Sequence, residues 1–572
     1  MEILLFLALA TAIMLATQNI QKRRMYRYRE SSFGKEKGTD NWRQEEESIA
    51  CYHRTELKAG GIDDITWNDL ELDCIYNDMN ITQSNCGAEY LYAMLRKPVA
   101  EEMLLAKRHQ MSEKIKEDRE FRLNLQRVFF RLGKVYGASA YEMLLHCTTA
   151  LHIPALFHVG IFAFTMLAIL TLFINPWVGG CLSVLALFVS LYTYYKALFR
   201  IPDSGKWYLK NFSKMLKAAD RIVKINSPEL KPYQLELLDI LKCFRGVRLQ
   251  SVFLVSGTGI VADVYELVLD YICILTHADV LATGSITTKV RKNFPKARRL
   301  FEILGFLDAM TAVANYKLLL PFYSIPELKK EGSKDSEGLI AEELYHPGVR
   351  EPVPNSIRVT KGIVLTGSNA SGKSTFLKAV ALNGIFSQTL YLSTSRRYQG
   401  YFCQVYTSMT LRDSIENRDS YFLAEIKSLK RILEASRKER VLCCIDEVFR
   451  GTNTPERIAA STEILQSLGE GKAICLAATH DIDLARLLEG VYDNYYFTEQ
   501  VLADEISFDY KLMKGISYTG NALKLLKAYG YPENIVERAA RRLAEYEASG
   551  EWEQTAQGWF LQEGEEVYAS KN

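Results

Sequence analysis

The sequence has no pair of cysteines at C-x-x-C spacing and no histidine and cysteine cluster at the spacing of a zinc site, although it contains 11 cysteines and 8 histidines. These absences exclude the common zinc modules and the disulfide frameworks of small secreted domains. Cys443, Cys444 and Cys475 lie in apolar runs, as buried thiols do. We therefore expect reduced thiols in a cytosolic domain and no structural metal.

The chain also lacks an excess of charge of either sign, because 70 lysines and arginines balance 68 aspartates and glutamates. This balance argues against a globally basic nucleic-acid-binding coat but leaves a local basic face open. The densest basic run spans residues 289–299. Such a run is typical of a solvated helix face, and contact with phosphate groups is the alternative.

Long apolar runs, in contrast, are present. Residues 3–17 are almost wholly apolar and would form a helix roughly 22 Å long, against about 30 Å for a bilayer core. Glu2 precedes this run and Lys22-Arg23-Arg24 follow it, whereas a cleaved signal peptide carries its positive charge first. The order favours an uncleaved anchor at residues 1–24 with its C-terminal side in the cytoplasm. A cleaved signal peptide is the rival interpretation.

Two more apolar segments, residues 154–174 and 177–195, contain no charged residue and are separated only by Asn175-Pro176. Segments of this length with so short a separator predict a transmembrane helical hairpin within residues 151–200. The positive charge of Lys196 follows the second segment and places the next part of the chain in the cytoplasm. The sequence thus predicts an integral membrane protein.

Helical patterning surrounds the hairpin, with apolar residues at spacings of three and four between Leu91 and Leu132. Ser251–Leu275 is apolar enough for a fourth span, but three acidic residues fall on one of its helical faces, which favours a buried soluble helix. His158 lies inside the first hairpin segment. It either has a function in the membrane, or lies near the interface or pairs with the other helix.

The clearest motif fits G-x-x-x-x-G-K-[ST] and is the run Gly367-Ser368-Asn369-Ala370-Ser371-Gly372-Lys373-Ser374-Thr375. An apolar run precedes it and a helical pattern follows, so consecutive backbone N–H groups and a helix N-terminus would surround phosphate groups. Lys373 is expected to reach the β- and γ-phosphates of ATP, and Ser374 to ligate Mg²⁺. A glycine turn before a helix, without nucleotide, is the alternative.

Strand and helix patterns alternate from about residue 340 to 500. The continuous apolar runs Val441–Ile445 and Ala473–Ala478 are typical of parallel strands covered on both faces. Asp446 and Glu447 end the first run; we expect Asp446 to hold Mg²⁺ and Glu447 to polarise the attacking water. His480 ends the next run and is expected to contact the γ-phosphate.

These residues lead to a family. The run Asp446-Glu447-Val448-Phe449-Arg450-Gly451-Thr452-Asn453-Thr454 resembles the D-E-x-x-R-G-T-x-T of MutS, the mismatch-repair ATPase. The phosphate loop, Ala478-Thr479-His480 and the segment from Asp413 to Glu425 are similar to other MutS motifs, and the last would supply Ser420 as the signature serine. Phe508–Leu512, with Tyr510 at a base-stacking position, resembles the family's C-terminal segment.

Upstream, the resemblance covers about residues 60–100 and continues at Leu307-Asp308-Ala309, where it is similar to the MutS lever. It implies an ABC-type dimer with ATP and Mg²⁺ sandwiched between subunits, each site joining Lys373, Asp446, Glu447 and His480 to the Ser420 loop of the other chain. Three departures accompany it: there is no room for an N-terminal mismatch-reading domain, the apolar hairpin stands where the lever carries the DNA clamp, and Val353 occupies a position where the family has an aromatic residue.

The predicted fold is an α/β P-loop ATPase domain of ABC/MutS type with a parallel-rich sheet, preceded by an all-α lever that a transmembrane hairpin interrupts. The predicted domains are an anchor (1–24), a linker (25–60), two lever parts (61–150 and 201–335) around the hairpin (151–200), the ATPase domain with C-terminal dimerisation helices (336–548) and an acidic tail (549–572). The predicted activity converts ATP and water to ADP and phosphate in a cytoplasmic domain of a homodimer.

Two kinds of output are consistent with this organisation. One is a membrane-tethered ATPase that couples hydrolysis to DNA binding, in mismatch repair or other DNA maintenance. The other is an ATP-driven conformational switch that acts on membrane or protein partners without DNA.

Overall fold

The structure is a computed structural model that describes residues 33–35, 46–57, 60–148, 154–199, 203–254, 271–330, 338–360, 362–368, 371–409, 421–449, 452–502, 505–517, 523, 526–527 and 529–552. The chain forms two compact units. The first comprises Met1–Ser333 and Leu382–Tyr406, and the second Lys334–Ala381 and Thr407–Asn572. The predicted anchor at residues 1–24 and the acidic tail beyond Trp552 lie outside the described residues.

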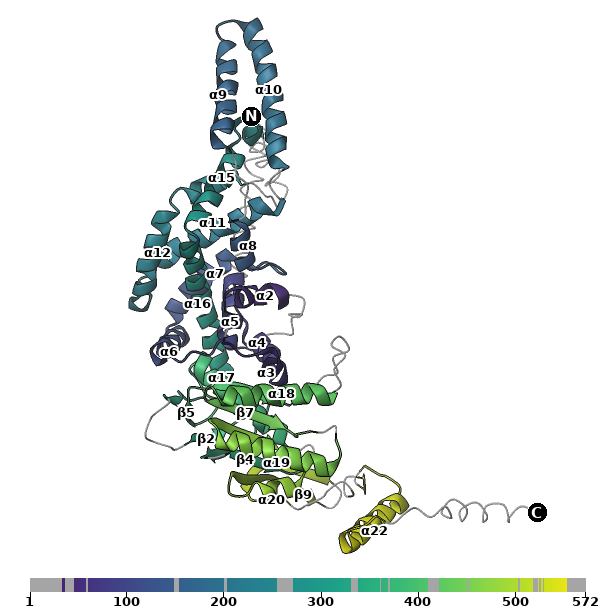
Figure 1. Ribbon diagram of the computed structural model, residues 1–572. Coiled ribbons are helices and arrows are strands. Elements are labelled where there is room, and N and C mark those ends of the chain that lie inside the picture. The colour runs from purple at the N-terminus through teal and green to yellow at the C-terminus, as the bar shows by residue number, and fades with distance from the viewer. Residues whose placement is uncertain are drawn as a thin grey trace, which may run out of the picture. The chain divides into compact units, whose positions relative to one another are not determined.

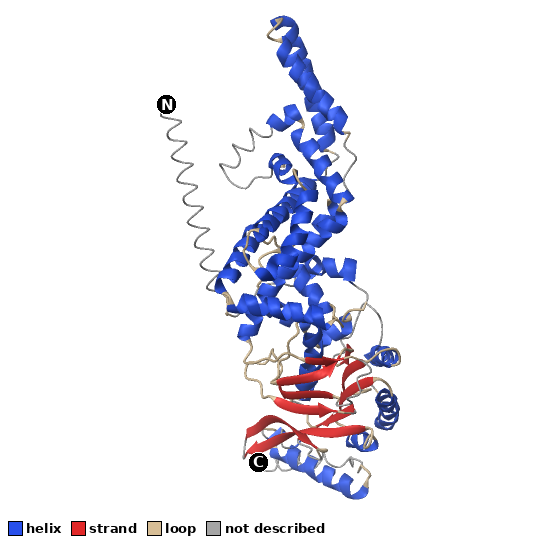
Figure 2. Cartoon of the chain, turned by 90° about the vertical axis from the view of Figure 1, so that its left-hand side faces the viewer, coloured by secondary structure: helices blue, strands red, loops and turns tan. Residues whose placement is uncertain are grey.

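The first unit is almost entirely helical, whereas most strands belong to the second (Figure 2). The helices of the first unit are α2 (Glu46–Tyr52), η2 (His53–Leu57), α3 (Asp64–Asp69), α4 (Leu72–Met79), α5 (Asn85–Arg96), α6 (Glu102–Glu117), α7 (Arg119–Leu132), α8 (Ala140–His146), α9 (Ala155–Thr171), α10 (Pro176–Leu198), α11 (Asp203–Val223), η3 (Pro228–Leu230), α12 (Lys231–Cys243), α13 (Val247–Gln250), η4 (Ser251–Phe253), α15 (Ala278–Lys292) and α16 (Phe294–Leu319).

The predicted amphipathic stripes of α5 and α7 are confirmed. Their apolar positions are buried, namely Leu91, Met94, Leu95, Phe121, Leu125, Val128, Phe129 and Leu132. Polar caps fix where these helices begin. Asp118 accepts from the Phe121 N–H at 3.0 Å at the start of α7, which satisfies one of the donors that a helix N-terminus leaves unpaired.

Two segments of the predicted lever meet at Asp308, a fully buried residue of α16. Its carboxylate accepts from the Ser84 hydroxyl at 2.6 Å and from the Ser84 and Gln83 N–H groups, 224 and 225 residues away along the chain. A Cβ on Gly87 would lie 2.3 Å from the Asp308 carboxylate, so only glycine fits in α5 at this point. Burial raises the pKa of Asp308 to about 6, although these hydrogen bonds oppose the shift.

The helices α9 and α10 pack against each other and project as a hairpin beyond the other helices of the first unit (Figure 1). Asn175 caps α10 by accepting from the Trp177 and Val178 N–H groups at 3.2 and 3.3 Å, and Pro176 suits the first helical position. Large apolar side chains are exposed along both helices and the turn between them, among them Leu156 (89%), Phe173 (86%) and Trp177 (88%).

One described helix is long and apolar enough to cross a membrane, namely Pro176–Ala197, of which 22% is buried. Ala155–Thr171 is apolar but shorter. Most of the apolar stretch Ser251–Leu275 falls at residues 255–270, outside the described part of the chain, so its interpretation as a soluble helix stays a prediction.

The basic run at residues 289–299 makes ion pairs within the helical unit. Lys296 binds Asp239 at 2.8 Å and Arg299 binds Glu236 at 2.6 Å, while Arg298 binds Glu56 and Glu302. These three cations therefore have acidic partners on neighbouring helices, which agrees with the expected solvated face rather than with a phosphate-binding surface.

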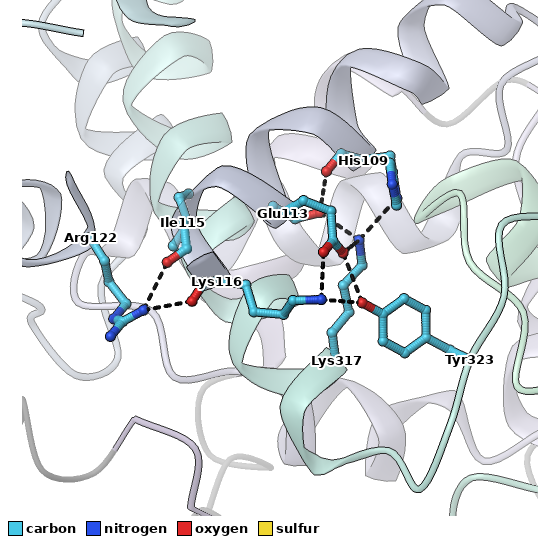
Figure 3. Close-up of polar contacts among 8 residues, drawn as sticks. His109, Glu113, Ile115, Lys116, Arg122, Lys317 and Tyr323 are labelled. Atoms are coloured by element: carbon cyan, nitrogen blue, oxygen red, sulfur yellow. Dashed lines mark hydrogen bonds and ion pairs between the residues drawn. The ribbon is translucent and has the colours of Figure 1, made fainter. Parts of the chain in front are cut away.

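A buried polar cluster joins α6 to the C-terminal end of α16 (Figure 3). Lys317 Nζ lies 2.9 Å from Glu113 Oε1, 2.7 Å from Ser112 Oγ and 3.2 Å from His109 Nδ1. Glu113 also binds Lys116 at 2.5 Å and accepts from the Tyr323 hydroxyl at 2.9 Å. The side chain of Lys317 is fully buried, so its charge is balanced inside the unit.

The segment Leu382–Tyr406 differs from the predicted domain division, because it groups with the helical unit and not with the α/β unit. The Val99 N–H donates to the Gln388 carbonyl at 2.9 Å, and Arg108 donates to the Thr389 carbonyl. The strands β1 (Glu327–Lys329) and β5 (Arg397–Tyr401) pair in parallel within this unit. Such contacts join residues hundreds of positions apart, which sequence pattern does not reveal.

The second unit has a six-stranded sheet of order β10-β9-β4-β8-β7-β6. Its strands are β4 (Gly362–Thr366), β6 (Gln404–Ser408), β7 (Val441–Asp446), β8 (Ala473–Ala478), β9 (Tyr492–Leu502) and β10 (Glu505–Lys514). The helices are α17 (Lys373–Thr389), α18 (Tyr421–Ser436), α19 (Thr454–Glu470), α20 (Ile482–Leu487) and α22 (Glu533–Ser549). The division between the units falls within α17 and β6.

The predicted parallel core is confirmed, since β4 pairs in parallel with β8 and β9, and β7 pairs in parallel with β8. β7 is buried at every position, which explains its uninterrupted apolar sequence. At one edge of this sheet, β9 and β10 pair antiparallel. A separate antiparallel pair, β2 (Leu339–Leu344) and β3 (Asn355–Val359), precedes the sheet in the chain.

Candidate active site

The loop between β4 and α17 has the strand–turn–helix setting that a phosphate cradle needs. Gly367 and Gly372 adopt φ values of 140° and 102°, a region that favours glycine. Lys373 Nζ donates to the carbonyl oxygens of Gly367 at 2.8 Å and Ser368 at 2.6 Å. Its ammonium group therefore lies against the loop that the sequence predicts for phosphate. Asn369 and Ala370 lie outside the described residues.

Two oxygen ligands lie together at the carboxyl end of the sheet. Asp446 is the last residue of β7, and its Oδ2 accepts from the Ser374 hydroxyl at 2.6 Å. A hydroxyl and a carboxylate are ligands that Mg²⁺ prefers, and their separation suits two neighbouring positions around one ion. The residues predicted to hold the metal thus fit it chemically.

Glu447 and His480 meet at the ends of neighbouring parallel strands. Glu447 Oε1 lies 2.8 Å from His480 Nε2, so the imidazole donates to the carboxylate. Glu447 has φ 58°, and its N–H donates to the Ala478 carbonyl at 2.9 Å, which extends the β7–β8 ladder by one residue. The left-handed backbone turns the side chain of Glu447 away from the continuing strand direction.

A pocket of about 800 Å³ adjoins these groups. That volume lies in the range of small-ligand sites, roughly 300 to 1,000 Å³. It combines the polar end of the sheet with an apolar wall, and its lining includes Ser368, Gly372, Lys373, Ser374, Thr375, Asp446, Glu447, Tyr345, Val349, Val353, Phe376 and Tyr510.

Tyr510 reaches the pocket through a bulge in β10. The register shifts between Phe508 and Leu512, and Tyr510 has φ 52°. Asn355 holds the bulge, because its amide donates to the Tyr510 carbonyl at 2.9 Å and accepts from the Leu512 N–H at 2.8 Å. A Cβ on Gly372 would lie 3.1 Å from the Tyr510 ring, so this ring packs closely on the phosphate loop.

The sequence and the known protein families can now be compared. Residues 363–547 match the family model of MutS domain V. The chain is 29% identical over 279 residues to mouse MutS protein homolog 4, and 33% identical over 218 residues to the DNA mismatch repair protein MutS of Natronomonas pharaonis. It is 32% identical over 250 residues to the MutS of Fervidobacterium nodosum.

The chain contains a MutS domain V. The matched parts cover 46%, 36% and 42% of this chain but only 28%, 25% and 30% of the three relatives, so the chain matches less than a third of their length. The predicted helical region followed by a mixed α/β domain is confirmed. Domain V contains the phosphate loop, the Asp446-Glu447 pair, His480 and Tyr510. Ser420 falls in domain V but lies outside the described residues, so its role stays a prediction.

Sequence reasoning missed the residues that support this site. Asn355 is one of them, and its hydrogen bonds to the Tyr510 bulge join positions 155 residues apart. Glu425 is buried and accepts from the Phe449 N–H at 2.5 Å, which supports the turn after Glu447. Arg457 binds Asp481 next to His480. The only sequence signal for Arg457 is a cation in the first turn of a helix, where the helix dipole disfavours it.

His158 of the hairpin contacts a histidine outside the two hairpin helices. Its Nδ1 lies 2.7 Å from Nδ1 of His277, the residue before α15. His277 Nε2 lies 3.1 Å from the Ser190 hydroxyl of α10, so His277 links both hairpin helices at their base.

Proposed function

We propose that this chain hydrolyses ATP to ADP and phosphate in its MutS domain V. The observation that carries the proposal is the convergence of Lys373, the Ser374–Asp446 pair and Glu447 on one 800 Å³ pocket. His480 contacts Glu447 from beside this pocket. Lys373 and the loop N–H groups bind the phosphates, and the bulge-borne Tyr510 offers a ring for the base. Glu447 orients the attacking water and accepts its proton as the water oxygen bonds to the γ-phosphorus. The bond from that phosphorus to the oxygen of the β-phosphate breaks, and ADP leaves.

Ser374 and Asp446 would hold Mg²⁺, which when bound neutralises charge on the β- and γ-phosphate oxygens. Asp446 would supply a carboxylate oxygen for the ion, at a position fixed by the end of β7. The role of His480 is to hold the Glu447 carboxylate and to contact the γ-phosphate once nucleotide is present. We assign these roles from the contacts above together with the family resemblance.

A homodimer is the proposed working form. In it, Ser420 of one chain completes the site of the other, and the phosphate bound by both chains favours the closed state by its differential affinity. Hydrolysis removes this difference in affinity, and the dimer opens. The helical unit, which contains the two lever parts, then carries the change to the hairpin.

We propose further that the α9–α10 hairpin anchors the chain in a membrane, with domain V in the cytoplasm. The exposed leucines, phenylalanines and tryptophan on both helices support this, because large contiguous apolar surfaces are rare on soluble monomers. The apolar segment at residues 3–17 would add a third span.

DNA is the proposed partner on the strength of relatives whose names include DNA mismatch repair. The alternative, an ATP-driven switch that acts on membrane or protein partners without DNA, is favoured by the exposed hairpin and by the acidic partners of the basic run. ATP turnover in detergent with and without duplex, branched and mismatched DNA distinguishes the two. Stimulation that weakens steeply with salt supports the DNA partner. An unchanged rate at low salt supports the switch.

The control for that experiment is Lys373→Ala in the same detergent. Its loss of turnover, with or without DNA, shows that the measured phosphate comes from this site. Turnover equal to that of the unsubstituted chain would contradict the proposed ATPase.

A further inference from the structure

The loop that carries His480 is held by an ion pair outside the pocket. Arg457 Nε and Nη2 donate to the two oxygens of Asp481, each at 2.9 Å. This bidentate geometry fixes the carboxylate in direction as well as in distance. Arg457 belongs to the first turn of α19, and Asp481 directly follows His480.

Both partners occupy positions where their usual role is different. Asp481 is the N-cap residue of α20, where an aspartate ordinarily accepts from the first helical N–H groups, yet its side chain makes no such bond. Arg457 places a cation near a helix N-terminus, which the helix dipole disfavours. Asp481 forms the ion pair in place of a helix cap, and Arg457 forms it from a position that the helix dipole disfavours. This indicates that the pair has a role of its own.

The loop is fixed at both ends around His480. On one side, the Thr479 N–H donates to the Leu365 carbonyl of β4 at 2.9 Å. On the other, the Asp481 N–H donates to the Thr479 hydroxyl at 3.0 Å while its carboxylate binds Arg457. His480, between these restraints, is left facing Glu447 at 2.8 Å.

We infer that Arg457 is a positioning residue for hydrolysis, which acts through Asp481 to hold His480 against Glu447. This inference rests on the proposed ATPase function. Without Arg457, the Asp481 carboxylate is released to cap α20, and the loop turns with it. His480 then no longer holds the Glu447 carboxylate in place, although the phosphate loop and Lys373 are untouched.

The experiment is a double-mutant cycle between position 457 and position 480 in the full chain in detergent. Arg457→Ala is expected to lower kcat at least about tenfold, as loss of orientation does, with the Kd for ATP changed less than about twofold. In a His480→Ala background, the same substitution is expected to change kcat less than about twofold. An equal drop in both backgrounds would overturn the inference and leave the pair a purely structural contact.

The matched control is Arg486→Ala, which removes the same charge from the exposed Arg486–Asp483 pair of α20, 3.7 Å apart. It is expected to leave kcat within about twofold, because exposed pairs contribute little. Arg457→Lys keeps the positive charge but cannot make the bidentate contact with Asp481. Its kcat is expected to lie between those of the wild type and Arg457→Ala.

A second measurement does not depend on activity. Hydrogen exchange followed by mass spectrometry is expected to be faster over residues 479–487 in Arg457→Ala, with the β4–α17 segment unchanged. Unchanged exchange over residues 479–487 overturns the inference even if the chain proves to have no ATPase activity. Absence of turnover in the unsubstituted chain would instead refute the proposed function.

Discussion

Two buried lysines, Lys317 in the helical unit and Lys373 in domain V, have opposite surroundings. Lys317 Nζ lies 2.9 Å from the Glu113 carboxylate, with a hydroxyl and an imidazole nitrogen as further partners (Figure 3). Lys373 Nζ donates to two backbone carbonyls at 2.8 and 2.6 Å and lines an 800 Å³ pocket. The first ammonium group is balanced within the fold, and the second is placed where an anion can bind.

The difference explains why burial alone does not identify a functional cation. Desolvation disfavours the charged form of the Lys317 side chain. For Lys317, burial lowers the pKa, and the nearby Glu113 opposes that shift. The comparison predicts that removal of Lys317 affects stability, whereas removal of Lys373 affects nucleotide binding.

The largest expected effect is that of Lys317→Met. The substitution removes the buried cation of the pair and leaves the half-buried Glu113 with Lys116 as its remaining cation. Breaking a buried ion pair costs about 3–5 kcal/mol. In thermal unfolding followed by circular dichroism, the first transition is expected at a much lower temperature than in the wild type. Adding Glu113→Gln in the same chain should recover part of that loss, and failure to recover any would contradict the pairing.

The next effect is that of Lys373→Ala, which should weaken ATP binding about 100-fold or more, equivalent to about 2.7 kcal/mol. Thermal stability should stay close to that of the wild type, because the site lies at a loop and not in the core. Binding of a fluorescent ATP analogue measures the first quantity. If Lys373→Ala lowered thermal stability but left ATP binding normal, Lys373 would have a structural role and the contrast with Lys317 would be contradicted.

The loss of stability of the helical unit at acid pH should depend on the protonation of Glu113. Burial alone would raise its pKa, but the hydrogen bonds from Lys116, Lys317 and Tyr323 outweigh it and lower the pKa to about 2 from the ordinary 4.5. The ionised form is therefore favoured in the folded state, and its stabilising contribution is present above about pH 4.5 and lost as the pH falls toward 2. Urea unfolding between pH 6 and 3 should show this loss, and Glu113→Gln should flatten it.

The smallest effect is expected for Tyr323→Phe, which removes the hydroxyl that donates to Glu113 at 2.9 Å. One hydrogen bond to a charged group contributes about 1.5–3 kcal/mol, and the remaining lysine contacts reduce the net loss to about 1 kcal/mol. The shift in the first thermal transition measures it. A shift as large as that of Lys317→Met would mean that the tyrosine, and not the lysine, balances Glu113.

Much of the candidate site could be predicted from the sequence, because its residues come at the ends of strands and in one glycine loop. Continuous apolar runs marked β7 and β8, and parallel strands bring their carboxyl ends to one edge, so Asp446, Glu447 and His480 were expected together. The helical unit was likewise expected from spacings of three and four.

The supporting contacts could not be predicted in the same way. The clamp of Asn355 on Tyr510, the pair of Arg457 with Asp481 and the cluster around Lys317 join residues that are 155, 24 and 204 positions apart. Each depends on tertiary packing and leaves no periodic pattern in the sequence. The same holds for His158, whose partner His277 lies 119 residues away.

The most direct test of the account is steady-state ATP hydrolysis by the wild type and by Glu447→Gln, with ATP binding measured on the same samples. The account predicts that Glu447→Gln binds ATP as the wild type does but turns it over at least about 100-fold more slowly, because the water loses its general base. Hydrolysis at the wild-type rate by Glu447→Gln would contradict the assignment of this site.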